Sequence, residues 1–246
     1  MTVSGATLLT YTSVDTSEVT GNPFGMKTNL GFTASGDVNG YTVSYLQVSK
    51  DQFAGMSSAR LSIDMGDMGT LAFDQGSGSG LKTIDDKTPT AAEEIWDGLD
   101  GTTVGGLVGA AGNTGVFNYI KSFAGVTLNA AARRGSGTAN SDGSSSGAGQ
   151  SAYDFALTGS GDTFGVDGLA WGVGYGEAEQ GEQTNAAGMK SDDIHHTIFA
   201  NYSMGPATIG YQYSDIQSGA NGTAGQLADA WGIAFNVNDS LSVSYG

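Results

Sequence analysis

The chain has 246 residues, a length that fits one large β-barrel or one or two ordinary domains, and it contains 41 Gly, 3 Pro and no Cys. The absence of Cys excludes disulfides and thiolate metal sites. The net charge of −16, from 25 acidic and 9 basic residues, argues against nucleic acid as a partner, because phosphates require clustered Lys and Arg, and instead fits a surface that gathers cations.

Alternation of apolar residues with small or polar ones recurs along the chain and predicts β-strands, because successive side chains of a strand point to opposite faces. In LAWGVGYG at 169–176, for example, the large side chains occupy one parity and Ala or Gly the other. Helical periodicity is weak outside residues 90–100. We expect thirteen strands, at about 2–12, 27–38, 41–50, 60–66, 69–75, 116–122, 125–134, 151–160, 169–177, 194–204, 207–214, 228–237 and 240–246.

Short turns and long polar loops alternate between these strands. Short turns are expected at 38–40, 66–69, 123–125, 160–168, 205–206 and 238–239. Long loops are expected at about 13–26, 51–59, 76–115, 135–150, 178–193 and 215–227. This alternation places all long loops at one end of an antiparallel sheet and all short turns at the other. No apolar run approaches the ~18 residues of a membrane helix.

Two kinds of β protein fit this pattern. In a soluble sandwich or barrel the apolar parity faces a core, whereas in a membrane barrel it faces lipid and the polar parity faces an aqueous lumen. The polar parity here holds mostly Gly, Ser, Thr, Asn, Ala and Asp, small residues that keep a lumen wide, and we expect the apolar parity to lack charged residues. Tyr and Trp gather toward strand ends, as in an aromatic belt. The pattern therefore favours an all-β transmembrane antiparallel up-and-down barrel that forms a single domain over 1–246.

The hairpin MGDMGTLAFDQGSGSG at 65–80 and the segment TPTAAEEIWDGL at 88–99 carry a family resemblance. They resemble the hairpin and the constriction loop of general bacterial porins, especially the glycine-rich acidic porins of alphaproteobacteria. The resemblance implies a sixteen-stranded barrel in the outer membrane of a Gram-negative bacterium, usually a homotrimer. It also implies that the third long loop, residues 76–115, folds into the lumen and narrows it, with its helical part at 88–99.

In this family, acids on the constriction loop face basic residues on the opposite wall. The resemblance therefore nominates six acids of the loop and four bases of the strands as constriction residues. They are Asp85, Asp86, Glu93, Glu94, Asp97, Asp100, Lys27, Arg60, Arg133 and Arg134. For each of them, a solvated charge on a loop or near a strand end is the alternative interpretation.

Two features depart from the family pattern. Bacterial single-chain barrels have an even number of strands, and the family's chains end in an aromatic residue, whereas this chain ends in SLSVSYG. We therefore expect that three further strands belong to the barrel, unless a miscount by one hides a barrel of twelve or fourteen strands.

Catalytic motifs are weak. GSSSG at 143–147 matches a nucleophile pattern but lies in a Ser/Gly loop, and His195 and His196 point to opposite faces of a strand. We therefore expect no enzyme. Acidic loops offer oxygen ligands for Ca²⁺ at Asp142, Asp192 and Asp193, although the ligand set is incomplete, and no other cofactor is expected.

The sequence thus predicts an outer-membrane porin for passive diffusion of small hydrophilic solutes and ions, with a preference for cations that follows from the excess of acids. Its expected partners are two further copies of itself, membrane lipid and lipopolysaccharide. Two alternatives stay open. One is a substrate-specific channel with an aromatic track in the lumen, for which Phe199 is the large aromatic residue on the lumen parity of a well-defined strand. The other is a soluble or surface-anchored β-sheet binding protein such as an adhesin.

Overall fold

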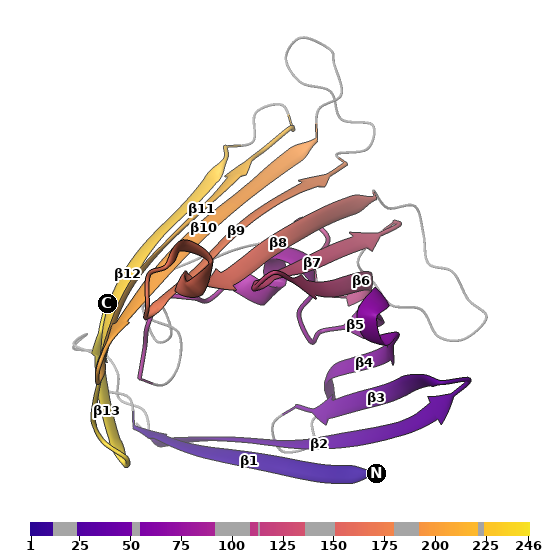
Figure 1. The fold of residues 1–246 in the computed structure, drawn as a ribbon, viewed down its shortest axis with the longest axis horizontal. Helices are drawn as coiled ribbons and strands as arrows, with labels where there is room; N and C mark the ends of the chain where they lie inside the picture. The colour runs from indigo at the N-terminus through magenta and orange to yellow at the C-terminus, as the bar shows by residue number, and fades with distance from the viewer. Residues whose placement is uncertain are drawn as a thin grey trace.

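The computed structural model describes residues 1–11, 24–50, 55–91, 109–112, 114–135, 151–179, 192–220 and 224–246. Within them the chain forms one antiparallel sheet of thirteen strands, in which every strand pairs with its neighbours in sequence (Figure 1). The strands are β1 (Thr2–Tyr11), β2 (Phe24–Val38), β3 (Tyr41–Ser49), β4 (Met56–Asp64), β5 (Thr70–Gln75), β6 (Thr114–Phe123), β7 (Val126–Arg133), β8 (Ala152–Ser160), β9 (Leu169–Ala178), β10 (Asp193–Met204), β11 (Ala207–Gln217), β12 (Gln226–Asn238) and β13 (Leu241–Tyr245). Each predicted strand is confirmed.

The short turns also lie where the sequence places them. Asn39 and Gly40 join β2 to β3 with φ angles of 54° and 84°, the two positive values of a type I′ turn, which suits the twist of a hairpin. Short 3₁₀ helices make two of the other connections: η2 (Gly66–Met68) joins β4 to β5, and η4 (Gly161–Phe164) lies between β8 and β9. A third, η3 (Gly80–Ile84), follows β5 and was not predicted. None of the helices in the described residues is long and apolar enough to cross a membrane.

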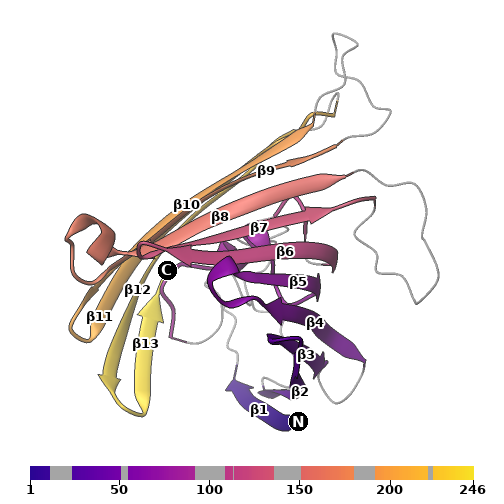
Figure 2. The ribbon, with the colours of Figure 1, turned by 45° about the vertical axis from the view of Figure 1, so that its right-hand side comes forward.

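The sheet curls round on itself, as Figures 1 and 2 show from two directions. β1 and β13 form its two edges, and in the described residues they do not pair with each other. A closed barrel needs its first and last strands to pair, so the structure shows the predicted up-and-down sheet in an open, curled form. The total of sixteen strands stays a prediction.

Large apolar side chains cover the outward face of the sheet. Phe117, Ile198, Ile209 and Trp231, for example, are each about half exposed, at 58%, 50%, 48% and 51%. An apolar outward face is what lipid requires.

The expectation that this outward parity carries no charge was wrong. By strand register, Lys121, Glu177 and Asp229 share it with Leu128, Tyr153 and Tyr213. All three lie near strand ends, where a charged group reaches the membrane surface at small cost. Each also has a polar neighbour: Lys121 Nζ donates to the carbonyl oxygen of Asp67, and the hydroxyls of Tyr175 and Tyr211 donate to Glu177 and Asp229.

The buried apolar residues lie between the inward face of the sheet and the segment that follows β5. One cluster combines Leu81 and Ile84 of η3 with Ala156 of β8 and Phe199 of β10. A second cluster combines Ala111 with Val116 of β6 and Ala131 of β7. The core of this molecule is therefore the contact between a loop and the inner wall of the sheet.

Candidate functional site

The loop that follows β5 runs along the inside of the curled sheet (Figure 1). Its described forward arm, residues 76–91, begins beside β4 and β5 and reaches β11 and β12, where Pro89 packs against Gly210 and Gly232. Its return arm is described at residues 109–112, which lie against β7, β8 and β9. Inward side chains of the sheet hold both arms by hydrogen bonds.

Asp74 holds the root of the forward arm. Its side chain is fully buried. Oδ2 accepts a hydrogen bond of 2.7 Å from Ser79 Oγ, and Oδ1 accepts one of 3.1 Å from the backbone N–H of Ser77. Arg60, which faces Asp74 across the β4–β5 pair, lies 3.4 Å from Oδ1 and donates through Nη2 to the carbonyl oxygen of Gly78. This buried charge is therefore compensated by an ion pair and by backbone and hydroxyl donors.

Asn118 and Asp154 hold the next part of the loop. Asn118 Oδ1 accepts from the N–H of Gly80 at 3.3 Å. Asp154 Oδ1 accepts from the N–H of Leu81 at 3.0 Å, and its Oδ2 accepts from the N–H of Ala111 at 2.7 Å. Asp154 therefore touches both the forward and the return arm of the loop.

Arg133 holds the return arm from β7. Its Nε donates to the carbonyl oxygen of Ala111 at 2.8 Å, and its Nη1 donates to the carbonyl oxygen of Gly135. The guanidinium is thus engaged by backbone carbonyls at the end of the loop.

The glycines of β9 make room for this loop. A Cβ at Gly174 would coincide with Leu81 Cδ2, and one at Gly176 would lie 2.7 Å from Ala110 Cβ. At Gly172 the space is filled instead by the ring of Phe199. In LAWGVGYG the large side chains therefore point outward. The glycines point inward, and at Gly174 and Gly176 the loop packs so closely that a side chain on β9 would clash with it.

Amide side chains of β10 and β11 hold the far end of the forward arm. Gln212 donates through Nε2 to Ile84 O at 2.7 Å and accepts through Oε1 from the N–H of Lys87 at 2.7 Å. Asn201 Nδ2 donates to Lys87 O at 2.6 Å. The path of the loop is thus fixed from β5 to β11 by inward polar side chains, of which the sequence predicted a role for Arg60 and Arg133 alone.

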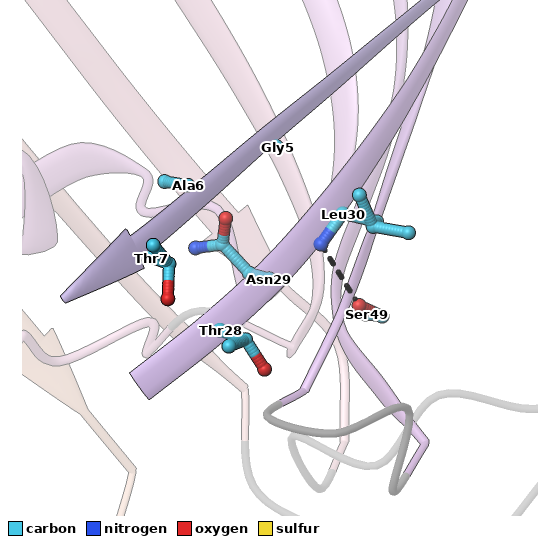
Figure 3. A pocket seen from close by; sticks show the side chains of 7 residues that line it. All are labelled: Gly5, Ala6, Thr7, Thr28, Asn29, Leu30 and Ser49. Carbon is cyan, nitrogen blue, oxygen red and sulfur yellow. Dashed lines mark hydrogen bonds between the residues drawn. The ribbon is translucent and has the colours of Figure 1, made fainter. Parts of the chain in front are cut away.

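The opposite wall, β1 to β3, is bare by comparison. Most of its inward side chains, such as Ser4, Ala6, Thr33 and Ser35, are small or polar and exposed, although Leu8, Leu46 and Val48 share this parity by strand register. The pairing of β2 with β3 ends at Gly31 and Val48, and residues 24–30 of β2 extend beyond this pair. A hollow of about 350 Å³ lies there (Figure 3), and most of its lining side chains are small: Gly5, Ala6, Thr7, Thr28, Asn29, Leu30 and Ser49.

The predicted loop acids that lie in the described residues are paired within the loop. Asp85 Oδ2 accepts from Lys82 Nζ at 2.6 Å, and Asp86 Oδ1 lies 3.7 Å from Lys87 Nζ. Glu93, Glu94, Asp97 and Asp100 lie outside the described residues.

The four predicted bases separate into two groups. Arg60 and Arg133 are half-buried and hold the two roots of the loop. Lys27, on the inward parity of β2, and Arg134, just after β7, are exposed. The structure thus brings the arginines to the loop backbone and leaves Lys27 on the bare wall.

Of the predicted calcium residues, Asp192 directly precedes β10 and is exposed, and Asp193 is the first residue of β10. Asp142 lies outside the described residues, and Asp193 Oδ1 accepts from the N–H of Gly219 at 2.7 Å. In the part of the chain that the structure describes, no group of three or more His, Asp or Glu side chains is placed to hold a metal ion.

A second hollow, of about 510 Å³, lies between the forward arm and the inner wall of β7 to β10. Hydroxyl and amide side chains share its lining with Lys87, with the rings of Trp171 and Phe199, and with small residues. The hydroxyl and amide side chains include Thr83, Thr127, Asn129, Thr158 and Ser160.

Comparisons with known proteins agree with this geometry. The family described as Gram-negative porin matches residues 1–246. The chain belongs to the Gram-negative porin family. A porin refined at 1.8 Å resolution has a TM-score of 0.60 and 14% sequence identity, with 95% of this chain and 77% of that chain covered. A triple mutant of the Rh. blastica porin has a TM-score of 0.49 and 13% identity, with 99% of this chain and 93% of that chain covered. No curated protein matches the chain. At such identities the similarity to the first of these porins shows the fold alone.

Proposed function

We propose that this porin forms a water-filled channel in the outer membrane of a Gram-negative bacterium and lets small hydrophilic solutes and ions diffuse through it. One observation carries the proposal: the described arms of the loop, residues 76–91 and 109–112, lie along the β6–β12 side of the curl and do not cover the mostly small or polar inward face of β1–β3. Water and solutes then pass between the loop and this bare wall. The apolar outward face supports a lipid environment, as does membership of the family.

We further propose that the channel prefers cations and assembles as a homotrimer. The net charge of −16 raises the local concentration of cations at a narrow aqueous passage. Asp85 and Asp86 contribute less than unpaired carboxylates would, because Lys82 and Lys87 lie beside them. The preference therefore rests on the overall excess of acids, and the nominated residues beyond 91 remain part of the proposal, as do contacts with lipopolysaccharide and a bound Ca²⁺.

The second candidate is a substrate-specific channel of the same architecture. The hollow of about 510 Å³ beside the loop, lined by hydroxyl and amide groups, favours it. Trp171 and Phe199 also line this hollow, but an aromatic track is less well supported, because Phe199 is only 5% exposed and its ring fills the space at Gly172. We therefore rank general diffusion first. The soluble β-sheet binding protein ranks last because of the apolar outward face.

Planar bilayers test the proposal with protein extracted from its native membrane. Under a salt gradient we expect discrete conductance steps, arriving in threes, and a reversal potential of the sign that cation preference requires. The control is the same measurement at high ionic strength, which screens fixed charge and reduces the preference. If folded protein gave no conductance steps, the proposal of an open channel would be wrong. If the reversal potential showed anion preference, the proposed cation selectivity would be wrong. Saturable flux of one solute would instead support the substrate-specific channel.

A further inference from the structure

One carboxylate on the sheet holds both arms of the loop. Asp154 lies on β8, and its side chain is 2% exposed. Its two oxygens accept from the N–H groups of Leu81 and Ala111, which are 30 residues apart in sequence. We call this arrangement the loop anchor, meaning Asp154 together with these two N–H groups. Asp74 and Gln212 differ from it because each binds the forward arm.

Small residues form a socket around the carboxylate. Gly80 has φ of +54°, and a Cβ there would coincide with Asp154 Oδ1. The same Cβ would lie 2.7 Å from Ala131 Cβ, and one at Gly109 would lie 3.3 Å from Oδ2. A backbone can approach the carboxylate this closely on both sides only because these positions lack side chains or carry a methyl group.

The anchor also explains how a buried carboxylate is tolerated. Burial of an ionised group is costly unless it is paired and hydrogen-bonded, and backbone donors to a carboxylate form the stronger, charge-assisted kind of hydrogen bond. Arg133 adds a positive charge beside the same return arm, because it donates to the carbonyl oxygen of Ala111, whose N–H binds Asp154. The polar groups of the socket thus converge on the place where the two arms meet.

We propose that Asp154 is the positioning residue that sets the cross-section of the pore. It fixes residues 81 and 111 at one place on the inner wall, between the root of the forward arm at Asp74 and its far tether at Gln212, so that both arms of the loop take their position from it. The inference rests on the proposed channel function. It assigns the constriction to an anchor at β8 rather than to the ends of β5 and β6, where the loop leaves the strands.

Asp154→Asn tests the anchor in planar bilayers with the full chain. The amide is nearly the same size, but it replaces one acceptor by a donor that faces a backbone N–H. We expect a substate of larger conductance, whose share of the open time rises about tenfold, as the loss of one charge-assisted hydrogen bond predicts. Asp37→Asn is the matched control, because it removes the same charge from the inward parity of β2, where the Asp37 side chain accepts from Gly40 in a turn.

The outcomes separate the anchor from the channel. If the wild-type protein gives conductance steps and Asp154→Asn has the same conductance and noise, the proposed role of Asp154 is wrong, but the proposed channel function is still supported. Equal effects of Asp154→Asn and Asp37→Asn would also overturn it, since loss of charge alone would then explain them. The mobility of Asp154→Asn on unheated gels shows whether this variant folds. If it does not, Ala111→Pro is the second test, because it removes the N–H that donates to Asp154 Oδ2 and leaves the residues of the sheet unchanged. The same substate is then expected.

Discussion

The two walls of this curled sheet differ although they share one sequence pattern. On the covered wall, β6–β12, inward residues such as Asn118, Ala156 and Ser214 are buried, with exposed fractions of 0%, 0% and 3%. On the bare wall, β1–β3, inward residues of the same small or polar kinds, such as Ser4 and Ser35, are exposed. The difference comes from the described arms of the loop after β5, residues 76–91 and 109–112, which pack on one wall and do not reach the other.

This comparison shows that alternation in a strand assigns a side chain to a face but does not say what covers that face. On the covered wall the same small residues serve as contact surface for a backbone, and the occasional larger polar residue serves as a tether. On the bare wall small residues leave space. The two walls therefore predict different responses to equivalent substitutions.

The largest contrast is expected for a glycine that gains a side chain. Gly174→Val places its Cβ where Leu81 and Ile84 pack, so the loop must move, and overpacking of this kind destabilises by about 1–3 kcal/mol. We expect a lower melting temperature and a changed single-channel conductance. In the control Gly31→Val, on the bare wall, the new Cβ meets the flexible hydroxyl of Ser4 at 2.8 Å. Equal losses of stability for both variants would contradict the difference between the walls.

The next contrast concerns the far tether. Gln212→Ala leaves the carbonyl of Ile84 and the N–H of Lys87 without their partner, which costs about 1–3 kcal/mol for buried groups. We expect faster hydrogen exchange at the amide of Lys87 and little change in the exchange of β1–β3. Asn29→Ala, on the bare wall, is the control and should leave the exchange at Lys87 as it is. Unchanged exchange at Lys87 in Gln212→Ala would mean that Gln212 does not hold the loop.

The strands and short turns were predictable because their signals are local. A two-residue period and dipeptides such as Asn39-Gly40 depend only on neighbours in the chain. The 3₁₀ helix at Gly80–Ile84 was not predictable, because GLKTI has no side-chain cap and takes its conformation against β7 and β8. Charges on the outward parity were also missed, since distance from the strand end matters more than parity.

The partners of the arginines could not be predicted for the same reason. Sequence position places Arg60 and Arg133 on inward parity, but their hydrogen bonds go to Gly78 and Ala111 of a loop whose path is set by distant strands. One signal was present in the sequence: Asp154 and Gln212 carry long or charged polar side chains on a parity otherwise dominated by Gly, Ala, Ser and Thr. Such exceptions identify tethers once a loop is known to cover the wall.

The smallest effect is expected for a charge on the bare wall. Lys27→Gln removes an exposed charge on the inward parity of β2. A unit charge about 10 Å from a passing ion contributes roughly 0.4 kcal/mol in water, about a twofold effect on a cation and the opposite effect on an anion. We therefore expect about a fourfold increase in the permeability ratio of cation to anion, seen as a shift of the reversal potential, with the melting temperature unchanged. Arg133→Gln is the informative counterpart on the covered wall, because its guanidinium donates to the loop backbone. There we expect the melting temperature to fall as well. If Lys27→Gln instead lowered stability and left selectivity unchanged, the β1–β3 wall would not line the passage, and the solute path would have to lie between the loop and the strands that it covers.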